Sequence, residues 1–261
     1  MQIVGYETGV GTDGDPEPAE LLVADRDGGI ERIDLSPGRT LTYDLDERHC
    51  AGTIHDGAHI ACSESAAPYC AAHRDVWVCA RCTGTCLKDE MDCHDPHAIY
   101  LAAFAPSRFK VGVTRLWRLE TRLREQGADR AAHVRTVENG RIAREIEAGL
   151  AADVDGLVDR VRVETKRAGL AATVDAAAWE RLLDRFDVLD RFTFEYGLDL
   201  TDRPMAETML TGRVVGTKGR LLVLERAGST YAVDLRDLVG HEVVDRRSER
   251  DLQASLGAFG G

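Results

Sequence analysis

Apolar and polar residues alternate in short runs near both ends of the chain, which is the pattern of half-buried β-strands. The runs near the N-terminus predict strands at 3–6, 21–24, 30–35 and 40–45. After Pro204 the same period returns, and it predicts strands at 210–215, 221–225 and 230–235. We therefore expect three units at the two ends: a β segment over 1–48, a small antiparallel β-barrel over 205–246 and a flexible tail over 247–261.

The centre of the chain predicts a hairpin followed by a helix. Two apolar runs, 98–104 and 109–114, flank a short turn, as expected for a pair of antiparallel strands. Leucines then recur at a spacing of three and four residues, which predicts a helix over 115–126. We expect Thr114 to cap the start of this helix and Gly127 to end it.

Further along, the pattern predicts one more strand at 132–137 and a second helix from Asn139 to about Leu150. These elements complete a unit that spans 98–152. Residues 153–204 follow as a helical segment. The side chains expected on the buried face of its second helix are Trp179, Leu182, Leu183, Phe186 and Leu189.

All seven cysteines fall within one stretch, residues 49–97, at spacings typical of metal ligands. Two tight turns, Cys70-Ala-Ala-His73 and Cys79-Ala-Arg-Cys82, each direct two soft ligands at one ion. Together with His73 the stretch offers eight ligands, which is enough for two four-coordinate zinc ions. The simplest partition places Cys50, Cys62, Cys70 and His73 in one site and Cys79, Cys82, Cys86 and Cys93 in the other.

Other roles fit these cysteines less well. An odd number of cysteines does not form a closed disulfide set, and the N-terminus lacks the basic head and apolar stretch of a secretory signal. Interleaved pairing of the eight ligands is equally compatible with the spacing, and His94 and His97 are alternative ligands. Because eight ligands saturate two sites and leave no position for a catalytic water, we expect the zinc ions to be structural.

Composition sets limits on the class of protein. The 261 residues are 44% apolar, but no apolar run approaches the length of a membrane span, so we expect a cytoplasmic protein with no membrane partner. The net charge of −12 and the scarcity of lysine are similar to the surfaces of proteins from a high-salt cytoplasm. Acidity normally argues against nucleic-acid binding, because phosphate contacts need basic side chains. Where acidity is a general adaptation to salt, that argument loses weight.

The unit over 98–152 carries a set of motifs: Tyr100 on its first strand, Lys110-Val111-Gly112-Val113-Thr114 on the second, arginines on the first helix and glutamates on the second. This order resembles the GIY-YIG nuclease superfamily, in particular its branch whose second strand reads Lys-Ile-Gly-x-Thr. The resemblance implies a β-α-β-β-α core whose tyrosine, arginine and glutamate meet on one face and hydrolyse phosphodiesters with one Mg²⁺ ion. The whole chain is similar to a functionally uncharacterised prokaryotic family that combines such a core with a cysteine-rich zinc segment and a terminal Gly-Lys-Gly β unit. The fold class we expect is therefore α+β.

The resemblance assigns roles to individual residues. Tyr100 takes the place of the first tyrosine, and Gly112 takes that of the glycine, where a missing Cβ lets a phosphate backbone approach the strand. Lys110 replaces the second tyrosine, which is a departure from the family pattern; it can contact phosphate but cannot duplicate a tyrosine base.

Two assignments leave a choice. The arginine that stabilises phosphoryl charge is Arg118 or Arg122, of which Arg122 lies deeper in the helix. Glu147 matches the metal-binding glutamate and is preferred over Glu145, which faces away from it.

Two functions follow from these assignments. The first is an Mg²⁺-dependent nuclease acting on DNA or RNA, stabilised by zinc. The second is a non-catalytic zinc-containing module that uses a degenerate nuclease core to bind nucleic acid or a protein partner. Lys110 favours the second function, and Glu147 favours the first, because a carboxylate beside phosphate serves little purpose without a metal ion.

Overall fold

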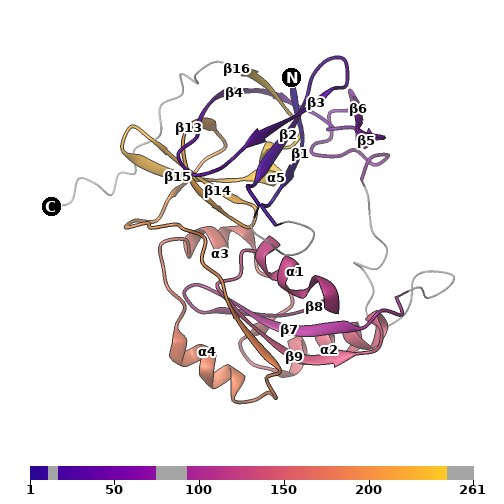
Figure 1. The fold of residues 1–261 in the computed structure, drawn as a ribbon, viewed down its shortest axis with the longest axis vertical. Coiled ribbons are helices and arrows are strands. Elements are labelled where there is room, and N and C mark those ends of the chain that lie inside the picture. Colours follow the sequence, from indigo (N-terminus) through magenta and orange to yellow (C-terminus); the bar gives the residue numbers. More distant parts are fainter. Residues whose placement is uncertain (11–16, 75–92, 246–261) are drawn as a thin grey trace.

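The protein is an α+β structure in which a nine-stranded sheet lies above a five-stranded sheet that carries most of the helices (Figure 1). We describe residues 1–10, 17–74 and 93–245 of a computed structural model. The predicted ligands Cys79, Cys82 and Cys86 and the predicted tail over 247–261 lie outside the described residues. No helix of the described part is long and apolar enough to cross a membrane.

The nine-stranded sheet joins the two ends of the chain. Its strands, in spatial order, are β12 (Met205–Ala206), β15 (Ser229–Asp234), β14 (Leu221–Arg226), β13 (Leu210–Lys218), β4 (Thr40–Arg48), β16 (His241–Asp245), β1 (Gln2–Glu7), β2 (Glu20–Ala24) and β3 (Ile30–Asp34). The seven strands predicted from period-two patterning are all present. The link is β4, which pairs antiparallel with β13 on one side and with β16 on the other.

This pairing changes the expected division of the chain. The segments 1–48 and 205–246 share one sheet and one apolar core, which includes Ile3, Leu41 and Val233. Among the described strands β3 and β12 form the two ends of the sheet, so the expected barrel does not close. Period-two patterning identifies a half-buried strand, but it carries no information about which distant strand becomes its partner.

The five-stranded sheet is built on a central hairpin. Its strands, in spatial order, are β10 (Leu157–Val158), β8 (Arg108–Arg115), β7 (His97–Phe104), β9 (Arg130–Val137) and β11 (Asp190–Thr193). Every residue of β7 is buried, because helices cover both faces of this strand. A short hairpin, β5 (Thr53–His55) with β6 (Ala58–Ile60), forms a separate two-stranded sheet.

The two predicted helices of this unit lie on opposite faces of the sheet. The helix α1 (Leu119–Glu125) packs Leu119 and Leu123 against the face that carries Tyr100. The helix α2 (Gly140–Asp153) packs against the other face, which carries Ile99 and Leu101. Since side chains alternate along β7, neighbouring residues of one strand reach different helices.

The start of the first helix differs from expectation. Thr114 belongs to β8, and a 3-10 turn, η2 (Leu116–Arg118), precedes α1, which therefore starts four residues later than predicted. Trp117, in this 3-10 turn, has 66% of its surface exposed. Apolar spacing gave the correct register for α1 but not its first residue, because a 3-10 turn continues the same spacing for one turn.

The segment 153–204 contains less helix than expected. Its helices are α3 (Val163–Ala168) and α4 (Ala176–Leu183), and it also supplies the edge strands β10 and β11. A fifth short helix, α5 (Leu235–Leu238), belongs to the other unit. Trp179, Leu182 and Leu183 of α4 are buried as predicted, whereas Leu189 is exposed because it lies beyond the end of that helix.

Candidate metal centre and cationic cavity

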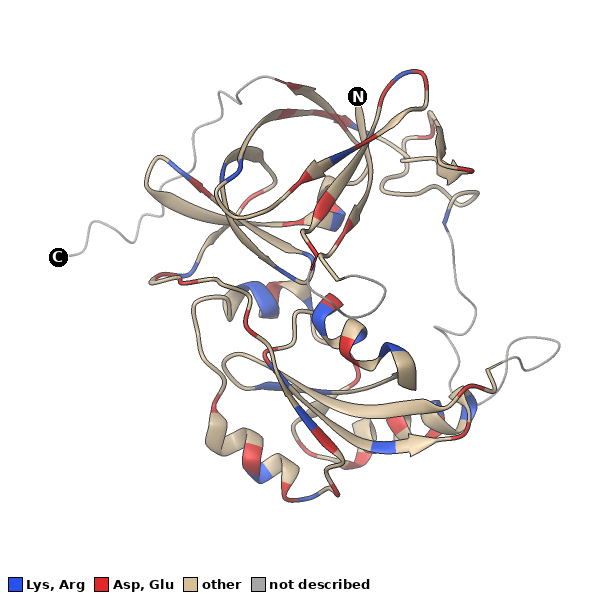
Figure 2. Cartoon of the chain, viewed as in Figure 1, with Lys and Arg blue, Asp and Glu red and all other residues tan. Residues whose placement is uncertain are grey.

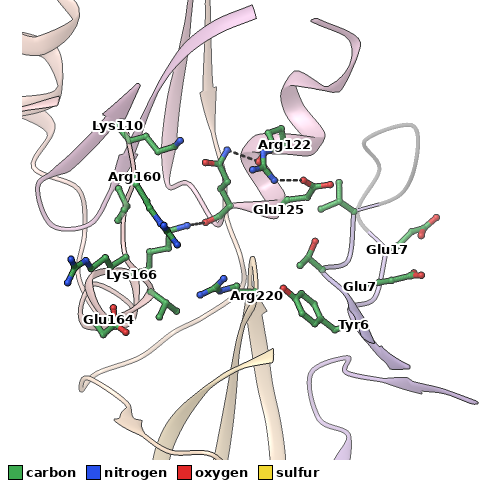
Figure 3. A pocket seen from close by; sticks show the side chains of 16 residues that line it. Tyr6, Glu7, Glu17, Lys110, Arg122, Glu125, Arg160, Glu164, Lys166 and Arg220 are labelled. Carbon is green, nitrogen blue, oxygen red and sulfur yellow. Dashed lines mark hydrogen bonds and ion pairs between the residues drawn. The ribbon is translucent and has the colours of Figure 1, made fainter. Parts of the chain in front are cut away.

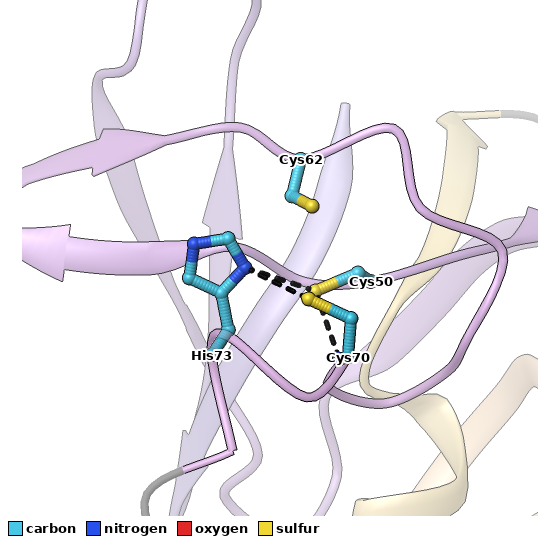
Figure 4. Close-up of side chains that lie close together, drawn as sticks. All are labelled: Cys50, Cys62, Cys70 and His73. Atoms are coloured by element: carbon cyan, nitrogen blue, oxygen red, sulfur yellow. Dashed lines mark hydrogen bonds between the residues drawn. The ribbon is translucent and has the colours of Figure 1, made fainter.

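Four of the predicted zinc ligands lie together beside the nine-stranded sheet (Figure 4). One ligand atom from each of Cys50, Cys62, Cys70 and His73 lies within 4.8 Å of the other three, and this group can hold a metal ion. The Nδ1 atom of His73 is 3.4 Å from Sγ of Cys50 and 3.3 Å from Sγ of Cys70. Four ligands bound to one ion at about 2.0–2.3 Å lie about 3.3–3.8 Å apart, so the two distances from His73 match those of a small tetrahedral site.

Main-chain hydrogen bonds build this centre. The N–H groups of Gly52 and Cys70 both donate to Sγ of Cys50, at 3.4 and 3.3 Å. The backbone N–H of Cys50 donates to Glu64, which fixes the loop carrying Cys62 beside the first ligand. Such N–H groups favour a thiolate, the form of cysteine that binds metal.

The surroundings of Cys70 lower the pKa of its thiol. Burial raises it, but hydrogen bonds from the backbone N–H groups of His73 and Ala72 and contacts with Cys50 lower it more, and the net effect lowers the pKa to about 7. The centre is therefore suited to a divalent cation.

The metal centre is anchored to the sheet by β4 and its neighbours. His49, next to Cys50, donates its backbone N–H to Gly240 at the start of β16. The side chain of Gln2 on β1 donates to the carbonyls of Cys50 and Gly240, at 3.3 and 3.1 Å. An ion held by this group would therefore link the loop from Cys50 to His73 to the sheet at the point where both ends of the chain meet.

Of the second predicted ligand set, the structure describes Cys93. It lies next to Gly140 at the start of α2, where a Cβ atom would stand 2.9 Å from Nε2 of His97 and 3.2 Å from Cβ of Cys93. Cys93 and the alternative ligand His97 are thus close neighbours.

A cavity of about 1140 Å³ lies between the two sheets (Figure 3). One wall comes from β1 and the segment after it, and the other comes from β8, α1 and α3. Of the residues that the structure describes, six cationic side chains line it, against four carboxylates. The cations are Lys110, Arg122, Arg160, Arg162, Lys166 and Arg220, and the acids are Glu7, Glu17, Glu125 and Glu164.

The carboxylates neutralise only part of this cationic cluster. Glu125 pairs with Arg122 and Asp234 pairs with Arg220, so two of the six cations have acidic partners. Glu7 pairs with Arg32, which does not line the cavity. In Figure 3 the carboxylates of Glu7 and Glu17 point outward on the side away from the lysines. Figure 2 shows basic segments on α1 and α3, the helices at the junction of the two units. A protein with a net charge of −12 therefore gathers positive charge at one place.

Tyr100 lies beneath this cavity and is only 1% exposed. Its hydroxyl accepts a hydrogen bond of 2.7 Å from Nε2 of Gln126 at the end of α1. A Cβ atom at Gly112 would lie 2.5 Å from the Tyr100 hydroxyl, so the space predicted for an approaching phosphate backbone is filled by the tyrosine ring.

Lys110 and Arg122 both line the cavity, on the Tyr100 side of the sheet. Lys110 pairs across the hairpin with Ala102, and its Nζ lies 5.9 Å from the centre of the Tyr100 ring. Its ammonium donates to the carbonyl of Asp159. Arg122 lies 3.1 Å from a Glu125 oxygen and Arg118 lies 2.7 Å from the other, so Glu125 orients both candidate arginines.

Glu147 does not join these residues. It lies on α2, whose apolar face packs on the opposite side of the sheet from Tyr100. Its carboxylate is buried and binds Arg144 at 2.7 Å, while Glu145 is exposed and binds Arg141. The structure thus brings Tyr100, Lys110 and Arg122 near one another and leaves the predicted magnesium ligand on the other face.

Sequence reasoning missed the part of the cavity that comes from distant segments. Arg220 follows β13, whereas Arg160, Arg162 and Lys166 flank or belong to α3. The run of basic residues at 160–167 was a usable signal, because three of its members line the cavity. Nothing in the local sequence links that run to Arg220, since the two sheets bring them together.

Comparison with known proteins places the chain in a family. A family profile described as "Protein of unknown function (DUF2797)" matches residues 38–243, which is more than half of the chain. The chain belongs to the DUF2797 family. The matched range contains the four clustered metal ligands and all six cations of the cavity, but not the β1 wall. No curated protein and no solved structure matches the chain.

Proposed function

We propose that this DUF2797 protein binds the phosphate backbone of a nucleic acid in the cavity between its two sheets, without cleaving it. The observation that carries the proposal is the gathering of six cationic side chains around one cavity in a strongly acidic protein. Phosphate neutralisation by lysine and arginine supplies most of the affinity of proteins for nucleic acids. Two residues assigned to phosphate from the sequence, Lys110 and Arg122, are among the six.

The position of Glu147 favours binding over hydrolysis. A nuclease of the GIY-YIG type needs its metal-binding carboxylate beside the phosphate, and Glu147 lies across the sheet in an ion pair with Arg144. The nearest acid to Arg122 is Glu125, which is held by two arginines. A core that lacks the metal-binding carboxylate at this site and has Lys110 in place of a tyrosine is suited to binding phosphate.

Zinc is the ion that we propose for the cluster of Cys50, Cys62, Cys70 and His73. Three thiolates and one imidazole are soft ligands that suit zinc and exclude Mg²⁺ or Ca²⁺, which prefer oxygen. With four protein ligands the ion has no open position, so its role is structural: it holds the loop from Cys50 to His73 against β4 and β16.

The test is binding and cleavage by the same protein samples. Binding of labelled single-stranded DNA, duplex DNA and RNA is followed by fluorescence anisotropy, and cleavage is followed on gels with Mg²⁺ added. We expect binding to at least one substrate, cleavage of none, and binding unchanged in Glu147→Ala where that variant remains folded. Cleavage that Glu147→Ala abolishes would contradict the proposal and establish the nuclease instead.

Variants of matched charge locate the binding site. Lys110→Ala/Arg122→Ala removes two cavity cations, whereas Arg141→Ala/Arg191→Ala removes two exposed arginines, each paired with a single glutamate elsewhere. Both double variants change the net charge equally. We expect at least tenfold weaker binding only for the cavity variant; equal weakening in both would show that binding is not localised to the cavity.

A further inference from the structure

Lys166 occupies the floor of the cationic cavity in an unusual setting for a lysine (Figure 3). Its Nζ atom donates a 2.7 Å hydrogen bond to the backbone carbonyl of Gln126 and lies 4.6 Å from the centre of the Phe104 ring. No carboxylate of the described residues lies within ion-pair distance of this amine. Lys166 is partly buried, and an ammonium withdrawn from water normally has such a partner, because an unpaired charge loses its hydration.

The charges around Lys166 also oppose its protonation. Burial lowers its pKa most, and Lys110 from β8, Arg220 beyond β13 and Arg122 from α1 lower it further. Asp234 acts in the opposite direction, and the net effect lowers the pKa to about 7. At neutral pH much of the amine is therefore uncharged and carries a free electron pair.

We infer that Lys166 is a nucleophilic amine that forms an imine with an aldehyde bearing a phosphate ester. A desolvated lysine next to other cations is the arrangement that activates an amine toward carbonyl groups. The neighbouring cations that keep Lys166 neutral would also hold the phosphate of the aldehyde. The inference rests on the proposed phosphate-binding role of the same cavity.

The reaction needs no redox partner. The electron pair of the neutral amine forms a C–N bond to the aldehyde carbon, and one N–H proton moves to the carbonyl oxygen, which gives a carbinolamine. The hydroxyl group then leaves with the second N–H proton as water, and a C=N bond remains. Borohydride added from outside delivers hydride to this carbon and fixes the adduct as a stable secondary amine.

Two sources of such an aldehyde are chemically equivalent at the cavity. One is a small sugar phosphate, and the other is the open-chain sugar of an abasic site, which is an aldehyde flanked by phosphodiesters. Their shared chemistry is an aldehyde carbon next to phosphate. Parallel experiments, one with a small aldehyde phosphate and one with abasic DNA, distinguish the two sources.

The test is reductive trapping on the folded full chain, followed by peptide mass mapping. The probes are glycolaldehyde phosphate, glycolaldehyde as its uncharged comparison, and duplex DNA with one abasic site. The chain has only four lysines, so the modified position is easily identified. Lys218 is the comparison, because it is buried, as Lys166 is in part, but its ammonium is paired with Asp129.

At pH 7 we expect glycolaldehyde phosphate to modify Lys166 at least ten times faster than Lys218 or the half-buried Lys110, and faster than glycolaldehyde does. Lys166→Arg should abolish this adduct, and Lys218→Arg should leave it. Equal modification of the three lysines, or equal rates with both aldehydes, would overturn the inference.

The two proposals fail separately. Nucleic-acid binding without trapping at Lys166 leaves the proposed function standing and overturns this one. Trapping of glycolaldehyde phosphate at Lys166 by a protein that binds no nucleic acid supports the amine chemistry and overturns the proposed function. A covalent adduct with abasic DNA through Lys166 supports both.

Discussion

The hydroxyl of Tyr100 and the side-chain amide of Gln126 are joined by a 2.7 Å hydrogen bond that connects the core strand β7 to the end of α1. The backbone carbonyl of the same glutamine accepts the hydrogen bond from Lys166. Gln126 therefore contacts both Tyr100 and Lys166. Tyr100, to which the family resemblance assigns phosphate chemistry, is buried and supports Gln126 at the cavity floor.

The contact between Gly112 and Tyr100 gives a first prediction. Gly112→Ala places a Cβ atom 2.5 Å from the tyrosine hydroxyl in a buried site, so we expect overpacking that costs about 1–3 kcal/mol of unfolding free energy. Gly149→Ala is the matched control, because Gly149 lies in α2 with nothing within 4 Å of its Cβ position, and alanine there favours the helix. Chemical denaturation of both variants checks this, and a neutral Gly112→Ala would show that the ring is free to move aside.

The metal centre gives a second prediction. His73→Ala should lower the zinc content, measured by mass spectrometry of the metal, by one ion per chain and should lower the melting temperature. His55→Ala is the control, because His55 is exposed on β5 and is not a member of the cluster. Removal of metal with a chelator should destabilise the native protein and leave His73→Ala nearly unaffected. An unchanged zinc content in His73→Ala would exclude this cluster as a zinc site.

Much of the local structure is readable from the sequence because it depends on neighbouring residues. Alternation of apolar residues predicts β1 and β13, and a continuous apolar run predicts β7. The turn spacing of Cys70 and His73 predicts that they share an ion, and the two lie in one cluster. Cys50 and Cys62 join the same cluster, which agrees with the simplest partition.

What the sequence does not reveal depends on pairings between distant segments. The pairing of Thr211 in β13 with Thr42 in β4 merges two predicted units into one sheet. The opposite placement of α1 and α2 separates Arg122 from Glu147, although the order of motifs places both in one site. Order along the chain fixes which elements follow each other, but the face that a helix covers depends on the whole sheet.

The ion pair between Glu147 and Arg144 gives a third prediction. Because this carboxylate is buried, Glu147→Ala leaves the arginine without its partner, and we expect a loss of about 1–3 kcal/mol of stability. A double-mutant cycle with Arg144→Ala measures the coupling between the two. If the stability losses of the two single variants add up to that of the double variant, the ion pair contributes nothing to stability. Weaker nucleic-acid binding by a stably folded Glu147→Ala would place Glu147 in the nucleic-acid site.

Lys166 gives a fourth prediction, on pH and stability. Its pKa is about 7 in the folded protein against an ordinary value of 10.5, so between these values the unfolded chain binds more protons. Stability from this group therefore rises with pH over that window, and the cost of burying the charge is fully present below pH 7. Lys166→Met has no charge at this position, so it removes the free-energy cost of burying the ammonium.

The measurement is the unfolding free energy of the native protein and of Lys166→Met from pH 6 to pH 10.5. We expect the variant to be more stable by roughly 3 kcal/mol or less at pH 6, with the difference shrinking as pH rises. Lys218→Met serves as a contrast, since Lys218 is paired with Asp129 and its loss should destabilise the protein. A stability difference between Lys166→Met and the native protein that does not vary with pH would contradict a neutral amine.

The most direct test of the central claim is the salt dependence of nucleic-acid binding. Each phosphate contact releases counterions, so the slope of log affinity against log salt counts the cations in contact. For a single strand we expect Lys110→Ala/Arg122→Ala to reduce the magnitude of that slope by about 1.4 relative to the native protein, at about 0.7 for each lost contact. The Arg141→Ala/Arg191→Ala control should retain the native slope. An unchanged slope in the cavity variant, or the same reduction in both variants, would contradict phosphate binding in the cavity between the two sheets.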